Sequence, residues 1–227
     1  MTPRGAARTR VMVVEDDGFT RTTLCAALRG AGVNVVADAG TAADALEAAR
    51  SHEPHAALID LDLGPGPGGI DLARALRDMY PRIGVVILTG YADPRLSGRN
   101  EIDLPGGTVY MTKTELSGAD VLARSIATSI RLAGDPRVSA APTRPRARGA
   151  TAGLTDVQVE VARMVADGLS NSEIADRRDV SAATVERIIQ RIARELGIET
   201  TSATNRRVLI AREFLRHGAS REGGPGR

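Results

Sequence analysis

The chain has 227 residues, of which 42% are hydrophobic and 2% are aromatic, and its formal net charge is +2. This length predicts two domains, and the small net charge gives no overall argument for a nucleic-acid-binding protein. The single cysteine, Cys25, excludes an intrachain disulfide, and no apolar run approaches the ~20 residues of a membrane-spanning helix. Because the basic start of the chain lacks an apolar stretch, we expect no secretory signal and a soluble, cytoplasmic protein.

Residues 9–133 alternate short apolar runs with helical patterns, which predicts an α/β fold with a parallel sheet. The expected strands are Arg10–Val14, Val33–Ala37, Ala56–Ile59, Ile83–Leu88 and Thr108–Met111. The expected helices are Arg21–Ala31, Ala42–Ser51, Ile70–Met79 and Leu116–Leu132. Five strands in this arrangement fit a flavodoxin-like sheet of order 2-1-3-4-5. The segment 91–107 is rich in Gly and Pro, so its helix is expected to be short or irregular.

Acidic residues follow two of the predicted strands. Glu15, Asp16 and Asp17 come directly after the first strand, and Asp60 ends the third. In a 2-1-3-4-5 sheet these two strands flank the switch in strand order, where ligands bind. Carboxylates gathered in this way repel one another unless a cation lies among them, and hard oxygen ligands with open positions suit Mg²⁺ and a phosphoryl group. Asp17 is interpreted instead as the start of the next helix.

Two further polar residues end predicted strands at the same edge of the sheet. Thr89 ends the fourth strand and supplies a hydroxyl, and Lys113 follows the fifth. Lys113 is the only lysine among 30 Lys and Arg residues. A compact ammonium can approach a carboxylate or phosphate end-on, which a guanidinium cannot copy, and this would explain a lone lysine.

Residues 134–152 contain three Pro and several Arg without apolar periodicity, and we interpret them as a linker. Residues 153–217 show only helical periodicity, and residues 218–227 are expected to be a disordered tail. Residues 134–227 hold 16 basic and 12 acidic residues, against 14 and 16 in residues 1–133. The basic surplus therefore belongs to the second half of the chain.

Four helices are expected in the second unit, each with an N-terminal cap. The caps are Thr155, then Ser170 or Asn171, then Ser181, then Thr201 or Ser202, with Gly168 and Gly197 as stops. The expected inward residues are Val157, Val161, Met164, Val165, Ile174, Ala175, Val185, Ile188, Ile189, Ile192, Val208, Leu209 and Phe214.

The second and third of these helices, joined by a tight turn, form a candidate helix-turn-helix. The third helix would carry the DNA-contacting side chains on its outward face, namely Thr184, Arg187, Gln190, Arg191 and Arg194. The pattern by itself is equally compatible with an ordinary solvated helical bundle.

The first unit resembles the receiver domain of two-component response regulators. The resemblance lies in an acidic pair, an Asp, a Thr and a Lys that occur in order, each at the end of a predicted strand. It implies that Glu15 and Asp16 bind Mg²⁺ and that Asp60 accepts the phosphoryl group. It also implies that Asp62 offers its backbone carbonyl to the metal, that Thr89 and Lys113 contact the phosphoryl oxygens, and that Thr89 and Tyr110 form the switch. Spacing alone leaves Asp60 and Asp62 as alternatives for the phosphoacceptor, and the family pattern favours Asp60.

The second unit resembles the LuxR-type DNA-binding domain. The matching residues are Leu154-Thr155, Gly168-Leu169-Ser170-Asn171, Glu173-Ile174-Ala175, Thr184-Val185 and Leu196-Gly197. Two positions depart from the family pattern, because Glu186 replaces the usual Lys and Ile188 replaces a common His. A Glu facing a phosphate would weaken binding, or it could accept a hydrogen bond from cytosine. Arg206 and Arg207 are expected to make phosphate or surface contacts.

The two resemblances together indicate a response regulator of the NarL/FixJ type. Its expected partners are a sensor histidine kinase and double-stranded DNA, bound as a homodimer, with no membrane and no catalysis on outside substrates. Two alternatives remain at this point. One is a phosphorylation-independent DNA-binding regulator, and the other is a receiver linked to a protein-interaction module.

Overall fold

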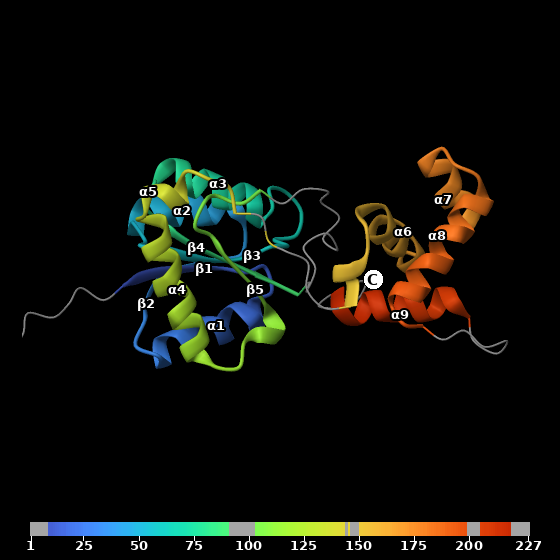
Figure 1. Cartoon of the computed structure of the whole chain (residues 1–227). Helices are drawn as coiled ribbons and strands as arrows, with labels where there is room; N and C mark the ends of the chain where they lie inside the picture. The colour runs from blue at the N-terminus through green and yellow to red at the C-terminus, as the bar shows by residue number, and fades with distance from the viewer. Residues whose placement is uncertain (1–8, 91–102, 144, 146–149, 199–204, 219–227) are drawn as a thin grey trace, which may run out of the picture. The chain divides into compact units, whose positions relative to one another are not determined.

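The computed structural model describes residues 9–90, 103–143, 145, 150–198 and 205–218 (Figure 1). These residues divide into two compact units. The first unit comprises residues 9–89 and 103–143, and the second comprises Gly90 and the described residues from 145 onward. Among the described residues, no helix combines the length and the apolar character needed to cross a bilayer.

The first unit is built on a parallel sheet of five strands in the order β2-β1-β3-β4-β5. The strands are β1 Arg10–Val14, β2 Asn34–Ala39, β3 Ala56–Asp60, β4 Gly84–Thr89 and β5 Val109–Thr112. The helices are α1 Gly18–Gly30, α2 Ala42–His52, α3 Gly69–Met79 and α4 Ala119–Ala133. The predicted strand order and the α/β class are therefore confirmed.

Helices cover both faces of this sheet, with α1 and α4 on one side and α2 and α3 on the other (Figure 1). Strands β3 and β4 are buried along their whole length, as expected for parallel strands covered on two sides. Side chains of α1 and α4 pack together with those of β1, β3 and β4 in one core cluster. This packing holds the carboxyl ends of the strands in place for the residues that follow them.

Helix α4 begins later than the sequence predicted. A short 3₁₀ helix, η2 Lys113–Glu115, follows β5, and α4 begins only at Ala119. The backbone N–H of Thr112 donates to the Glu115 carboxylate at 2.8 Å, which closes this turn. No cis peptide bond occurs in the described part of the chain, including the bond between Lys113 and Thr114.

The first part of the expected linker is folded on the first unit. Residues Pro136–Ser139 form α5, capped by Asp135, which accepts a hydrogen bond from the Arg137 N–H at 2.9 Å. Leu104 and Thr143 exchange two backbone hydrogen bonds of 3.0 and 2.9 Å. The boundary expected after residue 133 is therefore displaced to beyond residue 143, since these contacts join segments far apart in sequence. Most of the segment 91–107 lies outside the described residues.

The second unit contains η3 Ala150–Gly153, α6 Asp156–Ala166, α7 Asn171–Arg178, α8 Ala182–Glu195 and α9 Arg206–Gly218. Thr155, Ser170 and Ser181 cap α6, α7 and α8 as predicted, each accepting from a backbone N–H three residues on. The expected caps Thr201 and Ser202 lie outside the described residues.

Two predicted core positions of this unit are wrong. Val157 is 43% exposed and Val208 is 58% exposed, whereas Val159 and Ile210 are buried. Both errors place the apolar face of a helix too near its start. The buried set is decided by the packing of α6 against α8 and α9, in which Val159 and Ile210 share a core with Ile189.

Candidate functional site

Three carboxylates come together at the carboxyl edge of the sheet. Glu15 and Asp16 follow β1, and Asp60 is the last residue of β3. One oxygen atom of each lies within 4.8 Å of the others. Glu15 and Asp60 are only 2% and 7% exposed, whereas Asp16 is exposed to solvent. Two buried carboxylates and one open to water make a group that could hold a metal ion.

Lys113 lies against the buried part of this cluster. Its Nζ atom is 2.9 Å from Glu15 Oε2 and 3.2 Å from Asp60 Oδ2. Lys113 begins η2, directly after β5, so the sheet and the short turn together fix where its side chain starts. A single compact ammonium therefore bridges both buried carboxylates, which is the end-on approach expected of a lysine.

Burial, together with the neighbouring charge of Glu15, raises the pKa of Asp60 to about 7 against the attraction of Lys113. For Lys113, burial acts to lower the pKa, but Asp60 and Glu15 outweigh it and the pKa is raised. When both are ionised, the two buried carboxylates therefore carry more negative charge than the single Lys113 ammonium balances. Hard oxygen donors with unbalanced negative charge suit a divalent cation such as Mg²⁺.

The other residues of the predicted site lie near this edge or end a strand there. Thr89 ends β4, is 1% exposed and pairs in register with Thr112 of β5. Tyr110 is half-buried in the middle of β5. Asp62 is exposed, and its carboxylate is outside the three-residue cluster.

Asp17 caps α1 rather than joining the cluster. Its Oδ1 accepts from the Thr20 N–H at 2.7 Å, and this backbone hydrogen bond lowers the pKa of Asp17. The interpretation of Asp17 as the start of a helix is confirmed.

Two supporting residues were missed by the sequence analysis. Arg21 of α1 donates from Nη1 to the backbone carbonyl of Glu15 at 2.6 Å and pairs through Nε with Asp38 at 3.3 Å. Gly69, at the start of α3, lies so close to β3 that a Cβ atom there would be 2.1 Å from the Asp60 carbonyl oxygen. The Gly-rich loop after Asp60 was the available signal for Gly69, and no local pattern distinguishes Arg21.

In the second unit, α7 and α8 are joined by a tight turn in which Asp179 adopts a left-handed conformation with φ 52°. Of the expected DNA-contacting side chains, Arg187, Gln190, Arg191 and Arg194 are exposed on α8. Thr184 is half-buried, and its Oγ1 lies 2.9 Å from Ser181 Oγ and accepts from Arg187 Nη2 at 3.2 Å. The exposed face of α8 thus carries three arginines and one glutamine along its length.

Glu186 does not project freely from α8. Its Oε2 accepts from Asn171 Nδ2 at 2.9 Å, and its Oε1 accepts from Arg206 Nη1 at 3.2 Å. Glu186 therefore ties α8 to the start of α7 and to α9, and its effect on a DNA phosphate stays a prediction. Arg207 likewise donates to the Leu169 carbonyl and to Asn171, so it makes internal contacts.

Comparison with known families agrees with both units. Residues 11–103 match the response regulator receiver domain, and residues 152–210 match the bacterial regulatory proteins of the luxR family. The chain is 30% identical over 207 residues to the probable transcriptional regulatory protein NarL of Mycobacterium tuberculosis, covering 86% of this chain and 91% of that protein. It is 29% identical over 203 residues to the DNA-binding transcriptional activator DevR/DosR of the same species, covering 84% and 89%.

Among solved structures, the fold is similar to RcsB in a structure of two RcsB dimers bound to two parallel DNAs. The TM-score is 0.53 at 19% identity, and the match covers 93% of this chain and 99% of that one. The relatives match along most of their length, so the similarity extends over both units and their order. The chain belongs to the NarL-type response regulators, which join a receiver domain to a LuxR-type DNA-binding domain.

Proposed function

We propose that this protein is a phosphorylation-controlled transcription regulator, in which Asp60 accepts a phosphoryl group from a histidine kinase with the help of Mg²⁺. The observation that carries the proposal is the contact of one lysine, Lys113, with both Asp60 and Glu15 in a buried cluster. Burying a carboxylate is costly unless it is paired, so a carboxylate without such neighbours would lie at the surface and not at the buried end of a strand.

The chemistry is an in-line transfer. A carboxylate oxygen of Asp60 forms a bond to phosphorus while the bond between phosphorus and the imidazole nitrogen of the phosphohistidine breaks. The leaving imidazole then takes up a proton. Lys113, which contacts Asp60, would neutralise a phosphoryl oxygen, and the Thr89 hydroxyl would act beside it from the end of β4.

A divalent cation would be held by Glu15, Asp16 and Asp60, with the Asp62 backbone carbonyl as a further donor. When bound, Mg²⁺ supplies positive charge that offsets the charge of the transferring group. The residues fit such an ion, because they offer oxygen atoms and leave one carboxylate, Asp16, open to water.

The output is proposed to be binding of double-stranded DNA by a homodimer in the cytoplasm. The side chains proposed to contact DNA are Thr184, Arg187, Gln190, Arg191 and Arg194. A new charge of about −2 on Asp60 would draw Thr89 and Lys113 toward it, with Tyr110 following, and so bias the receiver between two states. The protein would lose its phosphoryl group slowly and would not act on outside substrates.

Intact mass after incubation with a small phosphodonor, with and without Mg²⁺, tests the first step. We expect one phosphoryl adduct that requires Mg²⁺ and that disappears in Asp60→Asn. Asp62→Asn is the matched control, because it removes a nearby exposed carboxylate and should keep the adduct. No adduct on the wild-type protein, or an adduct that survives Asp60→Asn, would refute the assignment and favour a phosphorylation-independent regulator.

A further inference from the structure

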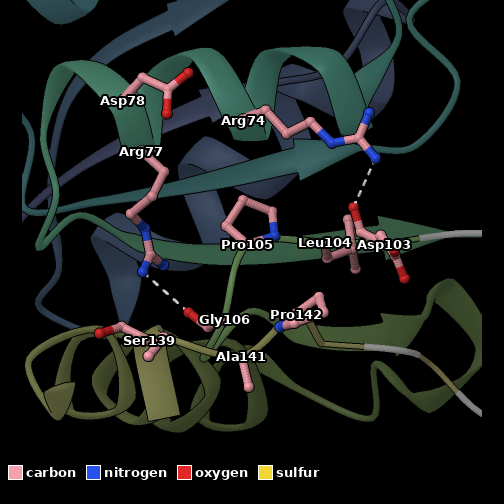
Figure 2. A pocket seen from close by; sticks show the side chains of 11 residues that line it. Arg74, Arg77, Asp78, Asp103, Leu104, Pro105, Gly106, Ser139, Ala141 and Pro142 are labelled. Atoms are coloured by element: carbon pink, nitrogen blue, oxygen red, sulfur yellow. Dashed lines mark hydrogen bonds between the residues drawn. The ribbon is translucent and has the colours of Figure 1, made fainter. Parts of the chain in front are cut away.

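The first unit contains a cavity that shares no residue with the acidic cluster. Its volume is about 330 Å³, within the range of small-ligand pockets. Figure 2 shows its three walls, which are α3 with Arg74 and Arg77, the segment Asp103–Gly106 that precedes β5, and the segment Ser139–Pro142 that begins at the end of α5. The cavity therefore lies where the beginning of the linker meets the receiver.

Arg77 is an unusual residue to find in this wall. Its Nη1 donates to the Gly106 carbonyl at 2.9 Å, as Figure 2 shows. Its Nε and Nη2 atoms are buried and have no hydrogen-bond partner in the described part of the chain. These two N–H groups form one edge of the guanidinium, and they are the parallel pair that binds two oxygens of a carboxylate or phosphate.

Leaving this edge unpaired is costly. Burial lowers the pKa of Arg77, which means that its charge is poorly solvated. The acidic residues of the lining do not relieve it, because Asp78 is exposed and neither Asp78 nor Asp103 is hydrogen-bonded to Arg77. Arg74 is already engaged through Nη2 with the Asp103 carbonyl at 2.9 Å. A missing acceptor for Arg77 is the simplest account of this arrangement.

We propose that this cavity binds the oxyanion of a small molecule, a carboxylate or a phosphate ester, on the Nε–Nη2 edge of Arg77. The ligand class follows from the two parallel donors, which match two oxygens on one atom. Pro105 and Pro142 offer apolar surface for the body of such a molecule, and Ser139 offers a hydroxyl in another wall of the cavity (Figure 2).

Occupancy of the cavity would act on the linker. Both nitrogens are covered in this structure, so an oxyanion reaches them only when residues 139–142, which line the cavity, move away from α3. This segment is attached to the receiver by the Leu104–Thr143 backbone pair. It also approaches Gly106 so closely that a Cβ atom there would be 2.3 Å from the Ala141 carbonyl oxygen. A bound oxyanion would add an attachment between α3 and the linker and would reduce the local opening of residues 139–143.

The test is an NMR titration of the ¹⁵N-labelled full chain with inorganic phosphate and, separately, acetate, in EDTA and at constant ionic strength. We expect saturable shifts of the Arg77 Nε–H and of amides in residues 136–143, with slower hydrogen exchange in the same amides. Arg77→Met should weaken binding at least tenfold. Arg77→Lys keeps the charge but lacks the paired donors, so it should also weaken binding at least tenfold. It provides the test if Arg77→Met fails to fold. Arg82→Met, an exposed arginine outside the cavity, should change it less than twofold.

The outcomes separate the possibilities. Response to phosphate alone identifies a phosphate ester as the ligand class, and response to acetate alone identifies a carboxylate. Small ions bind weakly, with a Kd of about millimolar, so the titration extends to about 50 mM. The absence of a saturable shift with either anion up to that concentration overturns the proposal. Binding that persists in both Arg77 variants also overturns it, because the anion would then lie elsewhere.

Discussion

Asp60→Asn should stabilise the receiver when no divalent cation is present. Burial and Glu15 raise the pKa of Asp60 from 3.8 to about 7, so the folded state holds this proton more tightly than the unfolded state does. Between pH 4 and 7 the folded state therefore loses stability as the pH rises, and above pH 7 the full cost is present. This difference in the pKa of Asp60 between the folded and the unfolded state corresponds to roughly 4 kcal/mol of stability at most.

The substitution removes this cost but also removes the contact between Asp60 and Lys113. Lys113 keeps its 2.9 Å contact with Glu15, so its charge stays paired. The expected net gain at pH 8 is about 1 to 3 kcal/mol, and it should fall by more than half at about pH 5, where Asp60 is protonated in the folded state.

Urea unfolding followed by tyrosine fluorescence in EDTA measures this gain. The chain has three Tyr and no Trp, and all three Tyr precede residue 111, so residues 150–218 contribute no tyrosine signal. Asp62→Asn, at an exposed position, should change the free energy of unfolding by less than about 0.5 kcal/mol. Excess Mg²⁺ should stabilise the wild type more than Asp60→Asn. If Asp60→Asn is no more stable than the wild type at pH 8, or if Asp62→Asn gains as much, the buried charge is not the cause.

Three further predictions concern other positions. Gly69→Ala should destabilise the receiver by at least about 2 kcal/mol in the same urea assay, because its Cβ would overlap the Asp60 carbonyl, whereas Gly30→Ala meets open space and should not. Glu186→Ala should lower the stability of the second unit by about 1 kcal/mol in calorimetry, since it releases two interhelical contacts, and an unchanged unfolding temperature would contradict this. Cys25 is buried with a raised pKa, so its thiol should react much more slowly at pH 8 in the folded protein than in urea; equal rates would show that the site is open.

The architecture and the elements of the candidate site were predictable from local patterns. Each strand is a short apolar run buried in the sheet, and the ends of parallel strands share one edge. The order of Glu15, Asp60, Thr89 and Lys113 along the chain was therefore enough to place them together, and the contacts of Lys113 with Glu15 and Asp60 follow that placement. The helix start at Thr155 and the starts at the other caps were also predictable, because a capping side chain accepts from a backbone N–H only three residues further along.

Contacts between distant segments were decided only by the tertiary structure. The attachment of the linker through Leu104 and Thr143 depends on backbone groups that carry no side-chain signal. The choice of Val159 over Val157 as a core residue depends on the helices that pack against α6. The pattern of α8 alone assigns Glu186 to the outward face, whereas its hydrogen-bond partners come from two other helices. The sequence by itself determined local structure and the order of the reactive groups, whereas long-range packing determined which side chains are covered and which remain free to bind.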